Sequence, residues 1–345
     1  MLPRIISPLL ATIIVLLSAR AHAFETTYWV WHRDTPLASG EIEVLKAQDV
    51  RALLWHAGTL KAEKDAWRLE NLQLPPRKPD PLAIIPVLRF STEGEAPLGD
   101  PAVQAVSQIL RETAHQAGAT EVQIDFDCPD RRLGEYATFL ARCRAHIAPT
   151  RLSATALAGW SHSPAFQQLQ AGVDALLPMF YDLLPDPPER VRAGQVLPLI
   201  DASVLATALA SWKACRIPWH AGLANFARVT LFDREGRSKG HLREWNWDEV
   251  CFNRELVLNG EPAPGVTLFR AENRTLLANT PVGAGMGVAC RWSDPAHLIQ
   301  AVESARQAGA AGIALFRLPG NGVQGGWSLR QIGTFLRDKT PGTPE

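Results

Sequence analysis

Short apolar runs and stretches of helical periodicity alternate along the chain. Eight runs have the length and composition of strands: Thr27–His32, Ala52–His56, Ala83–Phe90, Glu121–Asp127, Arg151–Leu157, Ala175–Asp182, Ile217–Leu223 and Gly312–Leu318. Helical patterns separate most of them, for example Gly40–Gln48, Pro101–Gln116, Leu133–His146, Asp294–Gln307 and a closing Leu329–Arg337. Strands that alternate with helices are typical of βαβ units, so the pattern predicts a parallel sheet.

Eight such units in a chain of 345 residues predict an α/β fold, a (β/α)8 TIM barrel over residues 24–340. The long segment 227–292 then becomes an insertion between strand 7 and helix 7. An open doubly wound sheet is the structural alternative. That fold is expected to carry a glycine-rich phosphate turn after an early strand, and the sequence has none.

Residues 1–23 have the pattern of a secretory signal peptide. Arg4 precedes an apolar run, Ile5–Leu17, and Ala21-His22-Ala23 supplies small residues at the cleavage positions. The run is short for a membrane span, although an uncleaved anchor remains the alternative. We therefore expect an exported protein, periplasmic or secreted, with no stable membrane span after signal cleavage.

Composition narrows the ligand class. The 35 basic and 35 acidic side chains balance, so no positive field indicates a nucleic-acid partner. The eleven tryptophans suit either a large core or sugar binding, in which indole faces stack on pyranose rings. The five cysteines show no C-x-x-C and the histidines no H-x-H spacing, so neither a metal nor a cofactor is predicted. One or two disulfides remain open.

Polar and aromatic residues recur where the predicted strands end, and in a barrel this rim carries the chemistry. The indoles there either stack on sugars or belong to the core, and the histidines either contact sugars or are ordinary hydrogen-bonded side chains. The arginines of this set, Arg89 and Arg317, either orient the aspartates or bind an anionic sugar. The candidate substrate-binding residues are Trp31, His32, Trp55, His56, Arg89, Trp160, Trp219, His220 and Arg317.

The segment Gln123–Asp127 is the sharpest candidate for catalysis. Strand alternation places Gln123, Asp125 and Asp127 on one face, with apolar residues on the other. Two carboxylates at i and i+2 lie about 7 Å apart at the backbone, so their repulsion raises one pKa. A carboxylic acid that keeps its proton near neutral pH suits the general acid of a glycosidase. Asp127, nearer the strand end, is the better candidate for that acid. Binding an arginine or capping a loop is the alternative role for the pair.

Two segments resemble the motifs of family 18 glycoside hydrolases, the chitinase group. Met179-Phe180-Tyr181-Asp182 matches M-x-Y-D, and Asp125 and Asp127 match the later aspartates of D-G-x-D-x-D-x-E. The resemblance implies that Tyr181 and Asp182 steady an N-acetyl group whose oxygen attacks the anomeric carbon. The first aspartate, the glycine and the catalytic glutamate are replaced by Val122, Gln123 and Pro129. The acid role of that glutamate therefore passes to no matching residue.

Most of the chain is also similar to a family of exported bacterial proteins known only as a domain of unknown function. That resemblance implies a glycosidase-like barrel and brings no established activity. It rests on Val122–Pro129, Leu152–Leu157 and Gly312–Pro319.

These features predict a glycoside-hydrolase-like protein that acts on a polysaccharide or oligosaccharide of the envelope or the extracellular space. A substrate that contains acetamido sugars is the first class to test. A non-catalytic glycan-binding barrel is the main alternative because the glutamate is missing. Metal-dependent glycosyl transfer is a third, since Asp-x-Asp also holds a divalent cation in nucleotide-sugar enzymes. Export argues against it because nucleotide sugars are cytoplasmic.

Overall fold

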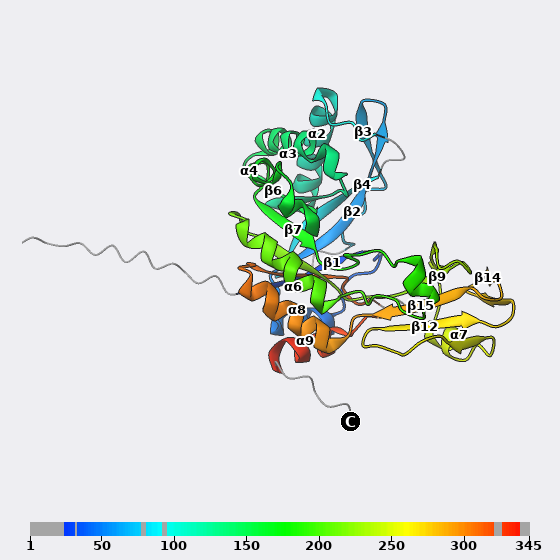
Figure 1. Cartoon of the computed structure of the whole chain (residues 1–345). Coiled ribbons are helices and arrows are strands. Elements are labelled where there is room, and N and C mark those ends of the chain that lie inside the picture. Colours follow the sequence, from blue (N-terminus) through cyan, green and yellow to red (C-terminus); the bar gives the residue numbers. More distant parts are fainter. Residues whose placement is uncertain (1–23, 32, 77–80, 92–94, 321–325, 339–345) are drawn as a thin grey trace, which may run out of the picture.

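Eight parallel strands close into a barrel (Figure 1). The structure is a computed structural model and describes residues 24–31, 33–76, 81–91, 95–320 and 326–338. The strands follow the order β1-β2-β4-β5-β6-β7-β8-β16, and β16 pairs with β1 to complete the ring. Their bounds are β1 Glu25–Val30, β2 Ala52–Glu63, β4 Ala83–Ser91, β5 Glu121–Asp125, β6 Arg151–Leu157, β7 Ala175–Met179, β8 His220–Ala224 and β16 Gly312–Phe316. The predicted (β/α)8 barrel is therefore confirmed.

Helices on the outside of the barrel connect most of the strands. Local signals set several of their ends: Asp294 accepts hydrogen bonds from the first turn of α8, and Gly118 takes a left-handed conformation after α2. The helices are α1 Ser39–Ala47, α2 Asp100–Ala117, α3 Leu133–Ile147, α4 Phe166–Ala171, α5 Pro188–Arg192, α6 Ala202–Ser211, α8 Pro295–Gln307 and α9 Leu329–Asp338. Single 3-10 turns lie at Asp130–Arg132, Ala158–His162 and Trp212–Ala214.

The connection from β2 to β4 differs from the predicted pattern. β2 continues beyond the expected end at His56 as far as Glu63, and β3 (Ala66–Glu70) folds back on it as an antiparallel hairpin. Trp67 on β3 is buried and packs against Phe90, with ring centroids 4.5 Å apart. A hairpin thus covers the part of the barrel wall where a regular unit would place a helix.

Between β8 and α8 the chain forms a second, antiparallel sheet in the order β10-β9-β15-β12-β11. Figure 1 shows this second sheet beside the barrel, on the side away from α2, α3 and α4. It has its own apolar core, which includes Val229, Val288 and Cys290. Its strands are β9 Ala227–Phe232, β10 Ser238–His241, β11 Leu256–Leu258, β12 Val266–Ala271 and β15 Gly287–Trp292. The same segment also contains α7 Trp247–Cys251 and a separate two-stranded hairpin of β13 Thr275–Leu277 with β14 Thr280–Val282.

Strand alternation gives the barrel two apolar layers. Side chains that point outward pack under the helices, as Val122, Ile124 and Phe126 do. A smaller cluster fills the barrel interior and includes Trp29, Leu54, Val87, Leu177 and Ala314. Because the interior is a packed core, chemistry is confined to the rims of the barrel.

The pairing of β16 with β1 and β8 provides a test of barrel closure. A Cβ atom added at Gly312 would lie 2.3 Å from the carbonyl oxygen of Glu25 and 2.7 Å from the Cδ2 atom of His220. We expect Gly312→Ala to lower the free energy of unfolding by about 1–3 kcal/mol, because backbone must shift to admit the methyl group. Gly40→Ala, where nothing lies within 4 Å of the new atom, is the control and should cost nothing. Urea unfolding measures both, and equal midpoints would contradict the prediction.

Candidate functional site

The paired aspartates lie where β5 ends. Asp125 is the last residue of the strand and is half-buried, and Asp127 is exposed at the rim two residues later. The Thr155 hydroxyl on β6 donates to Oδ1 of Asp125 at 2.8 Å and accepts from the backbone N–H of Phe126 at 3.3 Å. Below them, Nε1 of Trp29 donates to Oε1 of Gln123 at 2.8 Å inside the barrel. The polar face of β5 therefore points inward and is held by neighbouring strands.

The surroundings raise the pKa of both carboxyls. Burial raises the pKa of Asp125 to about 6; the Thr155 hydrogen bond opposes the rise, the charge of Asp127 adds to it and the charge of Arg89 opposes it. Although part of Asp127 is open to solvent, the protein around it removes enough water to raise its pKa as well, against the charge of Arg89. Within the described part of the chain neither carboxyl is in an ion pair. The site therefore holds a proton more readily than a surface aspartate.

Arg89 is the cation of this site. It lies on β4 directly across from Asp125 in the strand register, and its side chain is exposed. Its charge reaches both carboxyls without forming a close ion pair with either. Arg317 behaves differently, because burial alone lowers its pKa and its buried Nε has no hydrogen-bond partner. The expectation that Arg317 orients the aspartates therefore finds no contact to support it.

Aromatic side chains form one side of the barrel mouth. Trp31 at the end of β1 stacks on His56, with ring centroids 4.4 Å apart, and meets Phe316 edge-on at 5.7 Å. Phe316 also stacks on Tyr181, with centroids 6.2 Å apart. Burial and then the charges of Asp125, Asp182 and Asp127 raise the pKa of Tyr181 well above its usual value, so its hydroxyl remains a donor.

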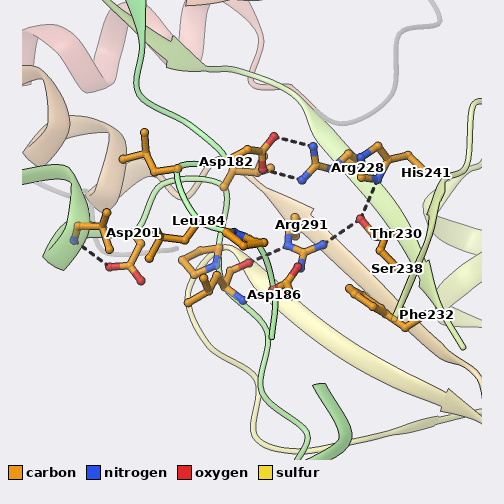
Figure 2. Close-up of a pocket in the computed structure, with 16 residues that line it drawn as sticks. Asp182, Leu184, Asp186, Asp201, Arg228, Thr230, Phe232, Ser238, His241 and Arg291 are labelled. Carbon is orange, nitrogen blue, oxygen red and sulfur yellow. Dashed lines mark hydrogen bonds and ion pairs between the residues drawn. The ribbon is translucent and has the colours of Figure 1, made fainter. Parts of the chain in front are cut away.

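Asp182 is engaged by the second sheet. Its two carboxylate oxygens accept from Nη1 and Nη2 of Arg228 on β9, each at 2.6 Å. Nearby, Arg291 on β15 is almost fully buried and binds Asp186 at 2.5 Å, the Thr230 hydroxyl and the Leu197 carbonyl. Figure 2 shows both ion pairs bridging the loop after β7 and the second sheet. Asp182 is therefore bound to Arg228, although the motif resemblance assigned it to substrate.

A cavity of about 440 Å3 lies between that loop and the second sheet. Asp182 and Arg228 are at one part of its wall, and Leu184, which is 51% exposed, also lines it (Figure 2). His241 on β10 joins the lining, and burial followed by the charge of Arg228 lowers its pKa. The cavity therefore has both polar and apolar walls, and Asp182, the residue after Tyr181, is part of them.

Three of the four predicted stacking tryptophans are core residues. Trp55 is 2%, Trp160 0% and Trp219 2% exposed, and all three pack in the layer between strands and helices. An indole stacks on a sugar only through an open face, so the prediction is wrong for these three. Trp31 alone reaches the mouth, and it is 8% exposed.

His220 is the first residue of β8 and binds Oε2 of Glu25 at 3.0 Å, at the opposite end of the barrel from the aspartates. Its prediction as a substrate contact is therefore wrong, because its strand begins there. His32 and the predicted signal segment 1–23 lie outside the described residues.

Sequence reasoning missed Thr155, Phe316 and Arg228. Thr155 and Phe316 lie within strands that the pattern predicts, and their inward register was the available signal. Arg228 had no such signal, since 46 positions separate it from Asp182. Only folding of the second sheet against the barrel brings the two together.

In the part of the chain that the structure covers, no cluster of three His, Cys, Asp or Glu side chains is arranged to hold a metal ion. All five cysteines are free thiols. No described helix combines the length and apolarity needed to cross a bilayer.

Comparison with known proteins agrees with this architecture. Residues 81–186 match the family model DUF3142, described as a domain of unknown function, and this segment contains β5 and both aspartates. Comparison with curated proteins gives no match.

Several solved structures share the fold at low sequence identity. The spore cortex-lytic enzyme SleL of Bacillus megaterium is similar with a TM-score of 0.59 and 13% identity, over 92% of this chain and 74% of that one. A glycoside hydrolase family 18 N-acetylglucosaminidase from Paenibacillus barengoltzii gives 0.54 and 14%, over 86% and 95%. A family 18 chitinase from Cycas revoluta in complex with (GlcNAc)3 gives 0.52 and 12%, over 91% and 98%. At these identities the likeness establishes the barrel fold.

The raised pKa of Asp125 predicts a pH-dependent cost to stability. The carboxyl titrates at about 6 when folded and at 3.8 in its ordinary state, so the folded protein favours the protonated form. The cost is absent below about pH 3.8 and grows to about 3 kcal/mol as pH rises through 6. We expect Asp125→Asn, which still accepts from Thr155, to be more stable than wild type at about pH 8 and equal to it at about pH 4. Urea unfolding at both pH values checks this, with the exposed Asp130→Asn as control; a gain of equal size at both would contradict it.

The buried ion pair of Arg291 predicts a large loss on truncation. The Arg291 side chain is 3% and that of Asp186 16% exposed, so Arg291→Met leaves a carboxylate without its partner in a dry place. We expect a loss of about 3–5 kcal/mol in the free energy of unfolding. The matched control is Arg51→Met, whose pair with Asp49 is about 70% exposed and should cost less than about 1 kcal/mol. A similar loss of unfolding free energy in Arg291→Met and Arg51→Met would contradict the stabilising role of the buried Arg291 pair.

Proposed function

We propose that this protein is a glycoside-hydrolase-like barrel that acts on a polysaccharide of the cell envelope or the extracellular space. The observation that carries the proposal is the pair of inward carboxyls at the carboxyl end of β5, both with raised pKa values. Carboxyls with raised pKa in a barrel rim are the groups with which glycosidases donate a proton to a leaving oxygen. Had Asp125 and Asp127 been paired with cations at the surface, the pKa of each carboxyl would have been lowered.

Asp127 is the proposed general acid. It is the more exposed of the two, so a glycosidic oxygen can approach it, whereas Asp125 lies deeper and is occupied by Thr155. The protein around Asp127 removes water from its carboxyl and raises its pKa, which favours retention of the proton. Arg89 then balances the carboxylate that remains after the proton has been given away.

The proposed substrate contains acetamido sugars. Tyr181, kept protonated beside Asp125 and Asp127, can donate to the acetamido group. The acetamido oxygen attacks the anomeric carbon, the bond to the leaving oxygen breaks, and Asp127 protonates that oxygen. Water then adds to the anomeric carbon and opens the cyclic intermediate, and its proton passes to the Asp127 carboxylate, which restores the acid. Support also comes from the similar barrels, one an N-acetylglucosaminidase and another a chitinase bound to (GlcNAc)3.

The proposed location is outside the cytoplasm, periplasmic or secreted. The signal-like pattern of residues 1–23 supports it, as does the nature of the substrate. Signal cleavage would leave a mature chain beginning near Phe24, one residue before β1.

A second function, binding without hydrolysis, is favoured by Pro129. The resemblance places the catalytic glutamate of chitinases at this position, and proline has no proton to give. A barrel of this kind would keep Tyr181, Trp31 and the inward carboxyls as a binding surface. Hydrolysis by the wild-type protein separates the two functions.

Release of reducing ends from a panel of acetamido and neutral polysaccharides tests the proposal. Asp127→Asn removes the acid while preserving shape, so we expect its turnover to fall at least about 100-fold. Asp130→Asn removes an exposed carboxylate three residues away and should retain wild-type turnover. Equal turnover by wild type and Asp127→Asn would exclude Asp127 as the acid. No release by the wild type together with retained binding to one polymer would establish the binding function instead.

A further inference from the structure

The tryptophans divide sharply by exposure. Of the eleven in the chain, eight are at most 8% exposed and belong to cores. The other three, Trp247, Trp292 and Trp327, are half-buried and all line one open hollow of about 290 Å3, together with Gly326. All the appreciably exposed indole surface of the protein is thus gathered in a single place. Trp247 also packs against the core of the second sheet and Trp327 against that of the barrel, so each ring has one side in a core and leaves the rest of its surface to the hollow.

Three separate segments bring these indoles together. Trp247 begins α7, Trp292 ends β15, and Trp327 lies just before α9. The rings of Trp247 and Trp292 meet edge-on, with centroids 5.8 Å apart at 79°, so they present walls at nearly a right angle. Behind Trp247 lies the buried ring of Trp245, at 5.0 Å.

Hydrogen bonds fix the third wall. The backbone N–H of Trp327 donates to Oδ1 of Asn225 at 2.9 Å, and its indole Nε1 donates to the Ser293 carbonyl at 2.5 Å. A Cβ atom at Gly326 would lie 2.7 Å from the Asn225 carbonyl oxygen, so only glycine allows this close approach. The rings are therefore held in position before any ligand arrives, and binding would cost little side-chain entropy.

The lining of the hollow and its place in the fold indicate the ligand. Among the residues described, none with a charged side chain lines it, which disfavours an ionic ligand. Asn225 follows β8 and also donates to the Arg317 carbonyl just beyond β16. The hollow therefore lies at the carboxyl ends of the strands, the end that carries Asp125 and Asp127.

From this arrangement we infer a second glycan site, in which the faces of Trp247, Trp292 and Trp327 stack on uncharged pyranose rings of a polysaccharide. The ligand class rests on the proposed function, but the site requires no catalysis. Flat apolar indole faces match the C–H faces of a pyranose, and an open hollow admits a ring of a continuing chain. The site would hold a polymer on the protein while the barrel mouth engages another part of it.

Retardation in native gels that contain hydroxyethyl cellulose or glycol chitin tests this site. We expect Trp247→Ala and Trp292→Ala to weaken binding to the retarding polymer about tenfold, and Trp247→Phe to recover most of it. Phe252→Ala is the matched control, since Phe252 is 79% exposed at the end of the same helix and does not line the hollow. Urea unfolding identifies any variant that has lost its fold.

The proposed function is tested separately in the same samples. Asp127→Asn should lose turnover and keep wild-type retardation, and Trp247→Ala should lose retardation and keep turnover of (GlcNAc)4. Retardation that depends on Trp247 without any turnover would support the hollow while the hydrolase proposal fails. Retardation by both polymers that is unchanged in Trp247→Ala and Trp292→Ala, or absent in wild type, would overturn the second site.

Discussion

Hydrogen bonding of β1 to both β2 and β16 closes the parallel sheet, and the rest of the structure depends on that closure. Because the eight strands of the closed sheet are parallel, all of them end at the same rim. The rim collects Asp125 from β5, Arg89 from β4 and Phe316 from β16. The interior below is filled by packed side chains such as Trp29 and Val87. At this end of the barrel a ligand can therefore contact only the mouth and the loops around it.

The acidic residues near the mouth fall into two electrostatic classes. Asp182 and Asp186 are neutralised by Arg228 and Arg291, which reach them from the second sheet. These pairs attach the sheet to the loop after β7 and fix the chain that follows Tyr181. Asp125 and Asp127 share a common face, no described arginine forms an ion pair with either, and burial raises the pKa of both. The difference in partners separates groups that hold the architecture together from groups that can exchange a proton.

The tryptophans show the same separation by environment. Trp160 and Trp212 are fully buried between strands and helices, where each contributes packing area and, for Trp212, a hydrogen bond to the Ala158 carbonyl. Trp247, Trp292 and Trp327 are half-buried and line one hollow between the start of α7, the end of β15 and the segment before α9. Most tryptophans of this protein therefore serve packing, and three of them leave indole surface open for the proposed second glycan site.

The sequence by itself determined the barrel. All eight predicted strands are present and close the ring, because strand periodicity and helix signals such as Asp294 act over short stretches of chain. The inward face of Asp125 follows from the same alternation. Only the tertiary structure decided which tryptophans are exposed and which end of β8 holds His220, and it made Arg228 the partner of Asp182. Those outcomes depend on burial and on contacts between residues far apart in the chain, and local periodicity carries no information about either.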